Sequence, residues 1–157
     1  LINMEKEELA LAPIVSDQVA FHQNKAQAKA IDLTLQPLAE LPPVLANRIN
    51  MEVVLSNLIS NAIRYTPEKG SITVSAHRDA DYVCLQVSDT GFGIAPEDLE
   101  RVFSRFYRVK NEQTRYIVGT GLGLPIVKGI VDAHNGRIEV ESQVGQGSTF
   151  SVFIPIA

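Results

Sequence analysis

Two separated clusters of glycines constrain the fold of this chain more than any other feature of its sequence. The first, DTGFGI, starts at Asp89, and the second, GTGLGL, starts at Gly119. Glycine lets backbone amides approach a ligand because no Cβ stands in the way. A carboxylate is repelled by phosphate but accepts a hydrogen bond from an amino group on a base. The two clusters therefore predict a nucleotide pocket built from distant segments, in which Asp89 reads the base and the second cluster wraps the phosphates.

The composition is that of a soluble globular domain with a hydrophobic core. The chain has 157 residues, of which 45% are hydrophobic and 20% are charged. A net charge of -4 gives no electrostatic reason to expect nucleic acid as a partner. The single cysteine, Cys84, excludes an internal disulfide and fits a reducing compartment. No apolar run is long enough to cross a bilayer. We therefore expect no membrane contact from this chain and a cytoplasmic location, although a parent protein could carry a membrane anchor elsewhere.

Residues 1–11 are expected to be the end of a helix that begins before this sequence. Residues 1–11 lack an initiator Met and are interpreted as the tail of a helix, so we expect a fragment of a longer protein whose domain proper spans residues 12–157. Pro13 predicts the start of a helix that runs to about Lys29. A short strand at 31–35 and a proline-containing loop at 37–43 should follow.

The segment from Asn50 to Tyr65 predicts the clearest helix. Its apolar residues recur at helical spacing and form one buried stripe: Met51, Val54, Leu55, Leu58 and Ala62. At this spacing Asn57, Asn61 and Arg64 fall together on the flank of the stripe. Two amides and a guanidinium therefore line one edge of the core, where the wall of a pocket is expected.

The remaining segments predict two strand hairpins and two helices. Alternating apolar residues indicate strands at 71–78 and 82–88 with a turn at 79–81, and two final strands at 137–142 and 148–155. Helices are expected at 96–103 and from 122 or 125 to His134, with Gly136 as the C-terminal cap. His134, at this helix end, would complement the helix dipole as a cation. The predicted fold is an α/β two-layer sandwich with one mixed, mostly antiparallel five-stranded sheet and helices on one face.

Four motifs occur in a distinctive order: paired asparagines on a helix, Asp-x-Gly-x-Gly after a strand, Gly-x-Gly-x-Gly before a helix, and Gly-x-Gly-x-Thr before the last strand. This order resembles the ATP-binding domain of sensor histidine kinases, of the Bergerat-type superfamily that includes gyrase, mismatch-repair and heat-shock ATPases. The resemblance covers nearly the whole chain from about Leu11. It implies ATP and Mg²⁺ as ligands and phosphoryl transfer to a histidine in a two-component system.

The resemblance also implies roles for individual residues. Asn61, in the stretch NLISNAIRYTP, would be the Mg²⁺ ligand, and Asn57 stands where related hydrolytic ATPases carry a water-activating Glu. An amide cannot usefully accept a proton, so ATP hydrolysis should be slow. Arg64 and Tyr65 match a Lys-Tyr pair near the phosphates. Arg108, in the stretch FSRFYR, matches an arginine that contacts the γ-phosphate. Arg108 and Asn61 are therefore the expected catalytic residues.

The other implied nucleotide-binding residues lie in the glycine motifs. They are Asp89, Gly91, Gly93 and Ile94 near the base and sugar, Gly119, Thr120, Gly121, Leu122, Gly123 and Leu124 around the phosphates, and Thr149 in the last motif. For Gly145, Gly147 and Thr149, a tight hairpin without any ligand role is an almost equally good interpretation.

The resemblance places the phosphoacceptor histidine on a separate two-helix dimerisation domain that precedes the ATP domain. None of His22, His77 and His134 stands in the family's acceptor context. The chain alone is therefore expected to be a monomer that binds nucleotide without phosphorylating itself. The intact kinase would be a homodimer that passes its phosphoryl group to a response regulator.

Three other functions remain open from sequence. The chain could be an ATP hydrolase of the same superfamily, a nucleotide-binding module that transfers nothing, or a relative of the anti-sigma kinases that phosphorylate a protein serine. A dinucleotide-binding interpretation of GTGLGL is rejected because the polar and basic segment before it does not predict the buried strand that this fingerprint requires.

Overall fold

The computed structural model describes residues 5–104 and 123–157. Its helices and strands follow the chain in this order: β1 (Glu7–Leu9), α1 (Leu11–Ala28), β2 (Asp32–Leu35), β3 (Val44–Ala46), α2 (Arg48–Tyr65), β4 (Ser71–Asp79), β5 (Tyr82–Asp89), α3 (Pro96–Leu99), α4 (Gly123–Ala133), β6 (Arg137–Gln143) and β7 (Gly147–Pro155).

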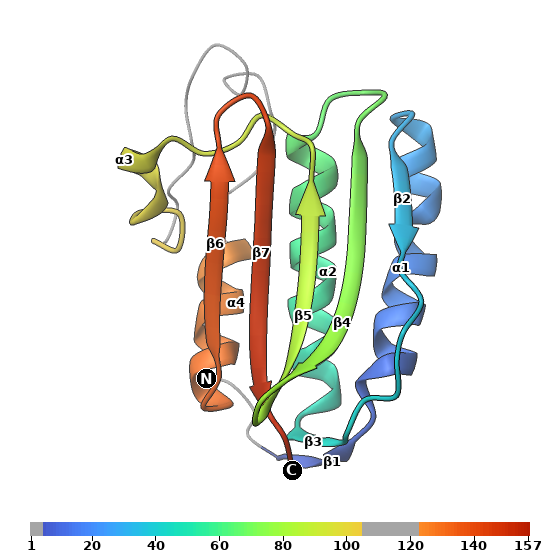
Figure 1. Ribbon diagram of the computed structural model, residues 1–157, viewed down its shortest axis with the longest axis vertical. Helices are drawn as coiled ribbons and strands as arrows, with labels where there is room; N and C mark the ends of the chain where they lie inside the picture. The colour runs from blue at the N-terminus through green and yellow to red at the C-terminus, as the bar shows by residue number, and fades with distance from the viewer. Residues whose placement is uncertain (1–4, 105–122) are drawn as a thin grey trace.

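The main sheet has five strands in the order β2-β4-β5-β7-β6. The pair β2 and β4 is parallel and the other pairs are antiparallel. Figure 1 shows α1, α2 and α4 side by side on one face of this sheet. The prediction of a two-layer α/β sandwich with a mixed, mostly antiparallel five-stranded sheet is confirmed.

The core lies between the sheet and these helices. The residues of β4 and β5 that the alternation predicted to face inward are buried: Ile72, Val74, Ala76, Val83, Leu85 and Val87. The predicted stripe on α2 is also buried, and Met51, Val54 and Leu55 are fully inaccessible to solvent. Burial of each such side chain contributes about 1.5–3 kcal/mol to folding. The helix begins where the side chain of Asn47 accepts a hydrogen bond from the backbone N–H of Asn50, at 2.9 Å.

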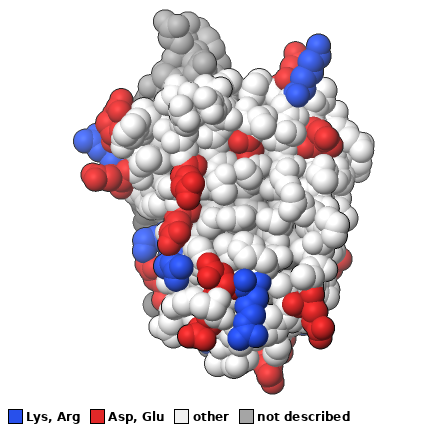
Figure 2. Space-filling model, viewed as in Figure 1, with Lys and Arg blue, Asp and Glu red and all other residues white. Residues whose placement is uncertain are grey.

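The opposite face of the sheet is open, and its middle carries polar, uncharged side chains on β5 and β7. Hydroxyls of Ser88 and Thr149 lie 2.8 Å apart across β5 and β7, and the amide of Gln86 donates to the hydroxyl of Ser151 at 3.0 Å. Figure 2 shows that the middle of this face bears few charged side chains. Thr149 therefore lies on the side of the sheet away from α2 and α4.

A small second sheet replaces part of the predicted leading helix. The expectation of a helical tail over residues 1–11 is wrong for Glu7–Leu9, which form β1 and pair antiparallel with β3. Leu9 and Val44 face each other in this pair and both are buried. Strands of three residues are too short to show a periodic pattern, so the sequence did not reveal them. Residues 1–4 lie outside the described part, and the domain boundary at residue 11 stays a prediction.

The predicted ends of two helices also differ from the structure. Helix α3 ends at Leu99, not at residue 103. After α4, the residue in the left-handed conformation is Asn135, with φ of 59°, and not Gly136. Gly136 has a different role: a Cβ on this residue would overlap the carbonyl oxygen of Phe153 in β7. Its missing side chain lets the chain turn from α4 into β6 while touching the sheet.

His134 is buried and neutral, so the prediction that it acts as a cation at the helix end is wrong. Its Nδ1 donates to the carbonyl oxygen of Ile130 at 2.8 Å, and its Nε2 accepts from the backbone N–H of Asn47 at 3.1 Å. Burial lowers the pKa of this imidazole, and the positive charge of Lys6 lowers it further. The ring thereby ties the end of α4 to the start of α2.

Candidate functional site

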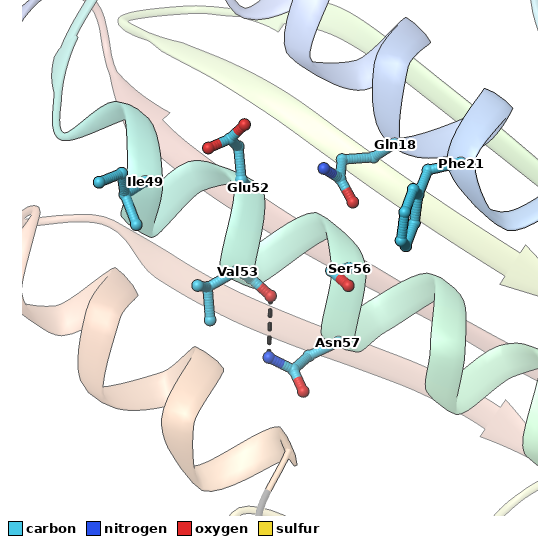
Figure 3. A pocket seen from close by; sticks show the side chains of 7 residues that line it. All are labelled: Gln18, Phe21, Ile49, Glu52, Val53, Ser56 and Asn57. Atoms are coloured by element: carbon cyan, nitrogen blue, oxygen red, sulfur yellow. Dashed lines mark hydrogen bonds between the residues drawn. The ribbon is translucent and has the colours of Figure 1, made fainter.

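Asn57, the first of the paired asparagines of α2, meets Gly123, the first residue of α4. The side chain of Asn57 donates from Nδ2 to the carbonyl oxygen of Val53 at 2.8 Å, which Figure 3 shows as a dashed line. Its Oδ1 lies 3.1 Å from the place that a Cβ on Gly123 would occupy. The structure therefore brings Asn57 and the last glycine of the second cluster together.

Asn61 lies one turn further along the same flank of α2 and is half-buried. Unlike Asn57, its amide forms no hydrogen bond with the residues that the structure describes. Its carbonyl oxygen can therefore serve as a ligand for a hard cation such as Mg²⁺. No cluster of acidic, histidine or cysteine side chains that could hold a metal occurs in the described ranges. A cation at Asn61 would thus take most of its ligands from water and from a bound phosphate.

Asp89 ends β5 and is held by backbone groups from two sides. Its Oδ1 accepts hydrogen bonds from the N–H of Gly91 at 2.8 Å and from the N–H of Ser148 at 3.2 Å. Burial raises the pKa of this carboxyl, and the two backbone hydrogen bonds act in the opposite direction. Within residues 5–104 and 123–157 no group donates to Oδ2. One oxygen therefore fixes the carboxylate, and the other is available to a ligand.

The first glycine cluster lies against the end of α2 and against the hairpin of β6 and β7. A Cβ on Gly91 would overlap the carbonyl oxygen of Tyr65, which also accepts a hydrogen bond from the N–H of Phe92 at 3.1 Å. Gly93 has φ of 75°, and a Cβ there would overlap the carbonyl oxygen of Gln143. Ile94 is buried, and its N–H donates to the hydroxyl of Ser142 at 2.7 Å. Glycine is required at both positions because this loop packs directly on backbone.

Thr66 and Lys29 complete the end of α2, and sequence reasoning missed both. The hydroxyl of Thr66 is the buried side-chain polar atom without a hydrogen-bond partner among the described residues, and it lies 3.0 Å from the Cβ position of Gly91. Lys29 donates from Nζ to the carbonyl oxygens of Ile63 at 2.9 Å and Arg64 at 3.1 Å. Burial lowers the pKa of Lys29, and the charge of Arg64 adds to this effect. Since Lys29 acts across 34 and 35 residues of chain, no local pattern could reveal its role.

The structure does not bring Thr149 together with the other predicted site residues. Its side chain lies on the open face, whereas its neighbour Ser148 pairs with Asp89 and is buried. The hydroxyl of Ser148 lies 2.7 Å from that of Ser142. Ser148, and not Thr149, therefore faces the candidate site. The alternation of β7 held this signal, because Phe150 and Val152 mark the inward side that Ser148 shares.

The other predicted residues divide into described and undescribed ones. Leu124 packs against the core at the start of α4. Arg64 and Tyr65 are half-buried at the end of α2. The rest lie outside the described residues: Arg108, Gly119, Thr120, Gly121 and Leu122.

This α/β fold is that of a known class of ATP-binding proteins. The family described as histidine kinase-, DNA gyrase B-, and HSP90-like ATPase matches residues 46–157. The chain belongs to this family, and an ATP-binding fold is thereby established.

Among the described residues, no helix combines the length and hydropathy that a membrane crossing requires.

Within the family the chain is similar to sensor histidine kinases. It is 32% identical to the catalytic domain of histidine kinase ThkA, with a TM-score of 0.83 and coverage of 97% of this chain and 96% of that one. It is 40% identical over 142 residues to the sensor-like histidine kinase SenX3 of Mycolicibacterium smegmatis, covering 90% of this chain and 37% of the relative. It is 47% identical over 105 residues to the sensor protein SrrB of Staphylococcus aureus, covering 67% of this chain and 18% of the relative. The predicted assignment to the histidine kinase catalytic domains is confirmed, and the chain spans only a minor part of these curated relatives.

Proposed function

We propose that this chain binds ATP and donates its γ-phosphoryl group to a histidine on an adjoining dimerisation domain, within a two-component sensor kinase. The observation that carries the proposal is the half-buried carboxylate of Asp89, with Oδ1 bonded to backbone N–H groups and Oδ2 without a donor in the described part of the chain. Such an acceptor fits the exocyclic amine of adenine. Guanine carries a carbonyl at that place and would leave the carboxylate facing another acceptor.

The surroundings of Asp89 support a purine ligand. The glycine loop leaves no side chain between the end of α2 and the carboxylate. Beside it lies the hydroxyl of Thr66, which has no hydrogen-bond partner among the described residues. A buried polar atom without a partner is rare in proteins, and such atoms concentrate where ligands or ordered water bind. A structure of the histidine kinase ShkA in complex with AMPPNP, 28% identical to this chain with a TM-score of 0.86, supports an adenine nucleotide as the ligand.

We further propose that Asn61 holds Mg²⁺ through its side-chain oxygen, with phosphates and water as the other ligands. Gly123 and Leu124, and by resemblance Arg64, Tyr65, Gly119, Thr120, Gly121 and Leu122, would surround the phosphates. Arg108 would neutralise charge on the transferred group, an effect that contributes a rate factor on the order of 10³ or more in phosphoryl transfer.

Asn57 favours a transferase over a hydrolase. Its Nδ2 is engaged with Val53, and an amide oxygen is far too weak a base to activate water. An imidazole nitrogen of the acceptor is a better nucleophile than water. It forms the new N–P bond as the bond between the γ-phosphorus and the bridging oxygen breaks. ADP leaves with the electron pair, and the imidazole releases its proton to solvent.

The partners are proposed from the same resemblance. Histidine kinase ThkA, in a form 29% identical to this chain with a TM-score of 0.81, has been solved in complex with the response regulator protein TrrA. We propose a response regulator as the final acceptor, a homodimeric parent with a cytoplasmic catalytic domain, and an acceptor domain joined through residues 1–11.

Calorimetry with Mg²⁺ and either ADP or GDP tests the base assignment. We expect ADP to bind at least about 100-fold more tightly, because GDP leaves buried polar groups unpaired. Equal affinities would contradict the proposal.

Radiolabelled ATP, mixed with the chain and a separately produced acceptor domain, tests the transfer. Label on the acceptor domain supports a kinase, steady phosphate release indicates a hydrolase, and binding without either product indicates a non-transferring module.

A further inference from the structure

Ser142 joins the two ends of the loop that the first glycine cluster forms. Its hydroxyl accepts a hydrogen bond from the backbone N–H of Ile94 at 2.7 Å and donates to the carbonyl oxygen of Gly147 at 3.1 Å. The carbonyl of Gly147 and the N–H of Ser148 belong to one peptide group, and that N–H donates to Oδ1 of Asp89 at 3.2 Å. One hydroxyl thus connects Ile94, at the end of the loop, to the carboxylate at its start.

The register of the sheet places these side chains in one row across three strands. Ser148 of β7 lies opposite Asp89 of β5 on one side and opposite Ser142 of β6 on the other. Residues directly opposite each other in an antiparallel pair share a face of the sheet. Figure 1 shows β5, β7 and β6 as neighbouring strands. The three side chains therefore lie together on the inward face of the sheet, away from the open one.

The hydrogen-bonding capacity of the Ser142 hydroxyl is completely used. A hydroxyl has one proton to donate and two lone pairs that accept. Ser142 donates its proton to Gly147, so in its contact of 2.7 Å with the hydroxyl of Ser148 it is Ser148 that donates. This contact and the N–H of Ile94 occupy both lone pairs of Ser142. The hydroxyl is therefore held in one orientation from three sides.

The peptide group between Gly147 and Ser148 transmits this orientation to the carboxylate. It is a trans peptide, so its C=O and its N–H point in opposite directions. A hydrogen bond to the carbonyl oxygen makes the N–H a stronger donor, because hydrogen bonds in a chain polarise one another. The bond from this N–H opposes the effect of burial on the pKa of Asp89. Loss of the Ser142 hydroxyl should therefore weaken the hold on Oδ1.

We propose that Ser142 is a positioning residue for base recognition, which holds Asp89 through the peptide group before Ser148 and does not touch the nucleotide. Asp89 presents Oδ2 to the ligand while Oδ1 is held by its two backbone donors. Ser142 orients one of these donors and also anchors the far end of the loop. This inference rests on the proposed function, and it adds a residue outside the four motifs that influences the choice of base.

Calorimetric titrations of Ser142→Ala with ADP and with inosine diphosphate, both in the presence of Mg²⁺, test this role. The affinity for ADP should fall about threefold to tenfold, as expected when one hydrogen-bonding partner is removed. Inosine diphosphate places a carbonyl at the carboxylate and gains nothing from its orientation, so its affinity should change by less than about twofold. The preference for ADP should therefore narrow, whereas a general loosening of the hairpin would weaken the binding of both nucleotides alike.

Two further variants separate the hydroxyl from its surroundings. Ser142→Thr keeps the hydroxyl on a side chain that suits a strand, so it should restore the wild-type ratio of affinities. Ser88→Ala is the matched control, because it also removes a cross-strand hydroxyl contact, to Thr149 at 2.8 Å, but on the open face of the sheet. It should bind both nucleotides as the wild type does.

A proton–nitrogen NMR spectrum of the ligand-free chain tests the hydrogen bonds independently of any nucleotide. In Ser142→Ala the amide proton of Ser148 should move upfield, because its bond to Asp89 weakens, and in Ser88→Ala it should stay near its wild-type position.

Several results would overturn the positioning role and leave the proposed function intact. They are an unmoved Ser148 amide or wild-type affinity for ADP in Ser142→Ala, equal losses for the two nucleotides, the same loss in Ser88→Ala, and a ratio that Ser142→Thr does not restore. Equal affinities of the wild type for ADP and inosine diphosphate would contradict the proposed function itself, and the positioning role with it.

Discussion

Replacement of Asp89 by asparagine should change which base the site selects. The backbone N–H groups of Gly91 and Ser148 both point at Oδ1, at 2.8 and 3.2 Å. In Asp89→Asn the side-chain carbonyl oxygen must take that place, because an NH₂ group there would face two donors. The NH₂ group then takes the place of Oδ2 and faces the ligand. The variant therefore offers a donor where the wild type offers an acceptor.

The size of the change follows from the hydrogen bonds involved. A hydrogen bond to a charged group contributes about 1.5–3 kcal/mol, and two donors left facing each other add a further penalty. We expect ADP to lose about 2–4 kcal/mol of binding free energy, which is roughly 30- to 700-fold in affinity. Inosine diphosphate carries a carbonyl in place of the amine, so it should gain about 1 kcal/mol relative to its binding to the wild type.

Calorimetric titration of both proteins with ADP and inosine diphosphate measures this exchange. The wild type should prefer ADP, and Asp89→Asn should bind the two nucleotides equally or prefer the inosine form. Thr149→Val serves as a control, because its hydroxyl bonds to Ser88 on the open face and should affect neither affinity. The reasoning is refuted if Asp89→Asn retains the wild-type preference for ADP, since the carboxylate would then not read the base.

Three further predictions concern stability. The free energy of unfolding should fall as the pH is lowered below about 6.5. Because the pKa of His134 is lowered in the native state, the unfolded chain takes up a proton at a higher pH than the native chain does. The stability that the neutral ring contributes is therefore present above pH 6.5 and is lost as the pH falls towards the native pKa. His134→Gln should flatten this part of a denaturation profile, and an unchanged slope would contradict the role of the ring. In urea denaturation, Gly93→Ala should lose more unfolding free energy than Gly145→Ala. Both positions have positive φ, which costs about 1–2 kcal/mol for alanine. Only a Cβ at Gly93 would also meet backbone atoms, because the Cβ position of Gly145 has no atom within 4 Å. Equal losses would show that the contact with Gln143 is unimportant. Lys29→Met should lower the free energy of unfolding by about 1 kcal/mol, because two carbonyl oxygens at the end of α2 lose their donor. The melting temperature should then fall by about 2–4 °C. An unchanged melting temperature would contradict the capping role.

The sequence predicts those parts of the fold that local periodicity encodes. The stripe on α2 and the alternation of β4 and β5 give the helices and hairpins nearly to the residue, because long amphipathic segments carry a strong signal. Helix ends are less well predicted, since a left-handed residue such as Asn135 is chosen by packing as well as by residue type. The pair of β1 and β3 has too few residues for any pattern.

The sequence predicts site residues where a motif fixes the backbone. It misses them where the register of a strand decides which side chain faces the site. Asp89 stands out in the sequence because a carboxylate comes just before two closely spaced glycines, and its role in binding a base stays a prediction. Ser148 is missed because a motif counts positions along the chain, while the choice between Ser148 and Thr149 depends on which side of β7 faces Asp89. Lys29 is missed because its partners lie on another helix.

The hydrogen bonds around Asp89 indicate that its carboxylate is positioned before any ligand arrives. Its loop is joined to β4 through the N–H of Thr90 and the carbonyl of Ser71 at 3.0 Å, and to α2 through Phe92 and Tyr65. It is joined to the hairpin of β6 and β7 through the N–H of Gly145 and the carbonyl of Phe92 at 2.9 Å. A loop held by three elements loses little conformational freedom on binding, so little of the binding energy is spent on ordering it. In the proposed function, discrimination between bases depends on Oδ2 of Asp89, which has no donor among the described residues, and a single substitution at Asp89 should be sufficient to change it.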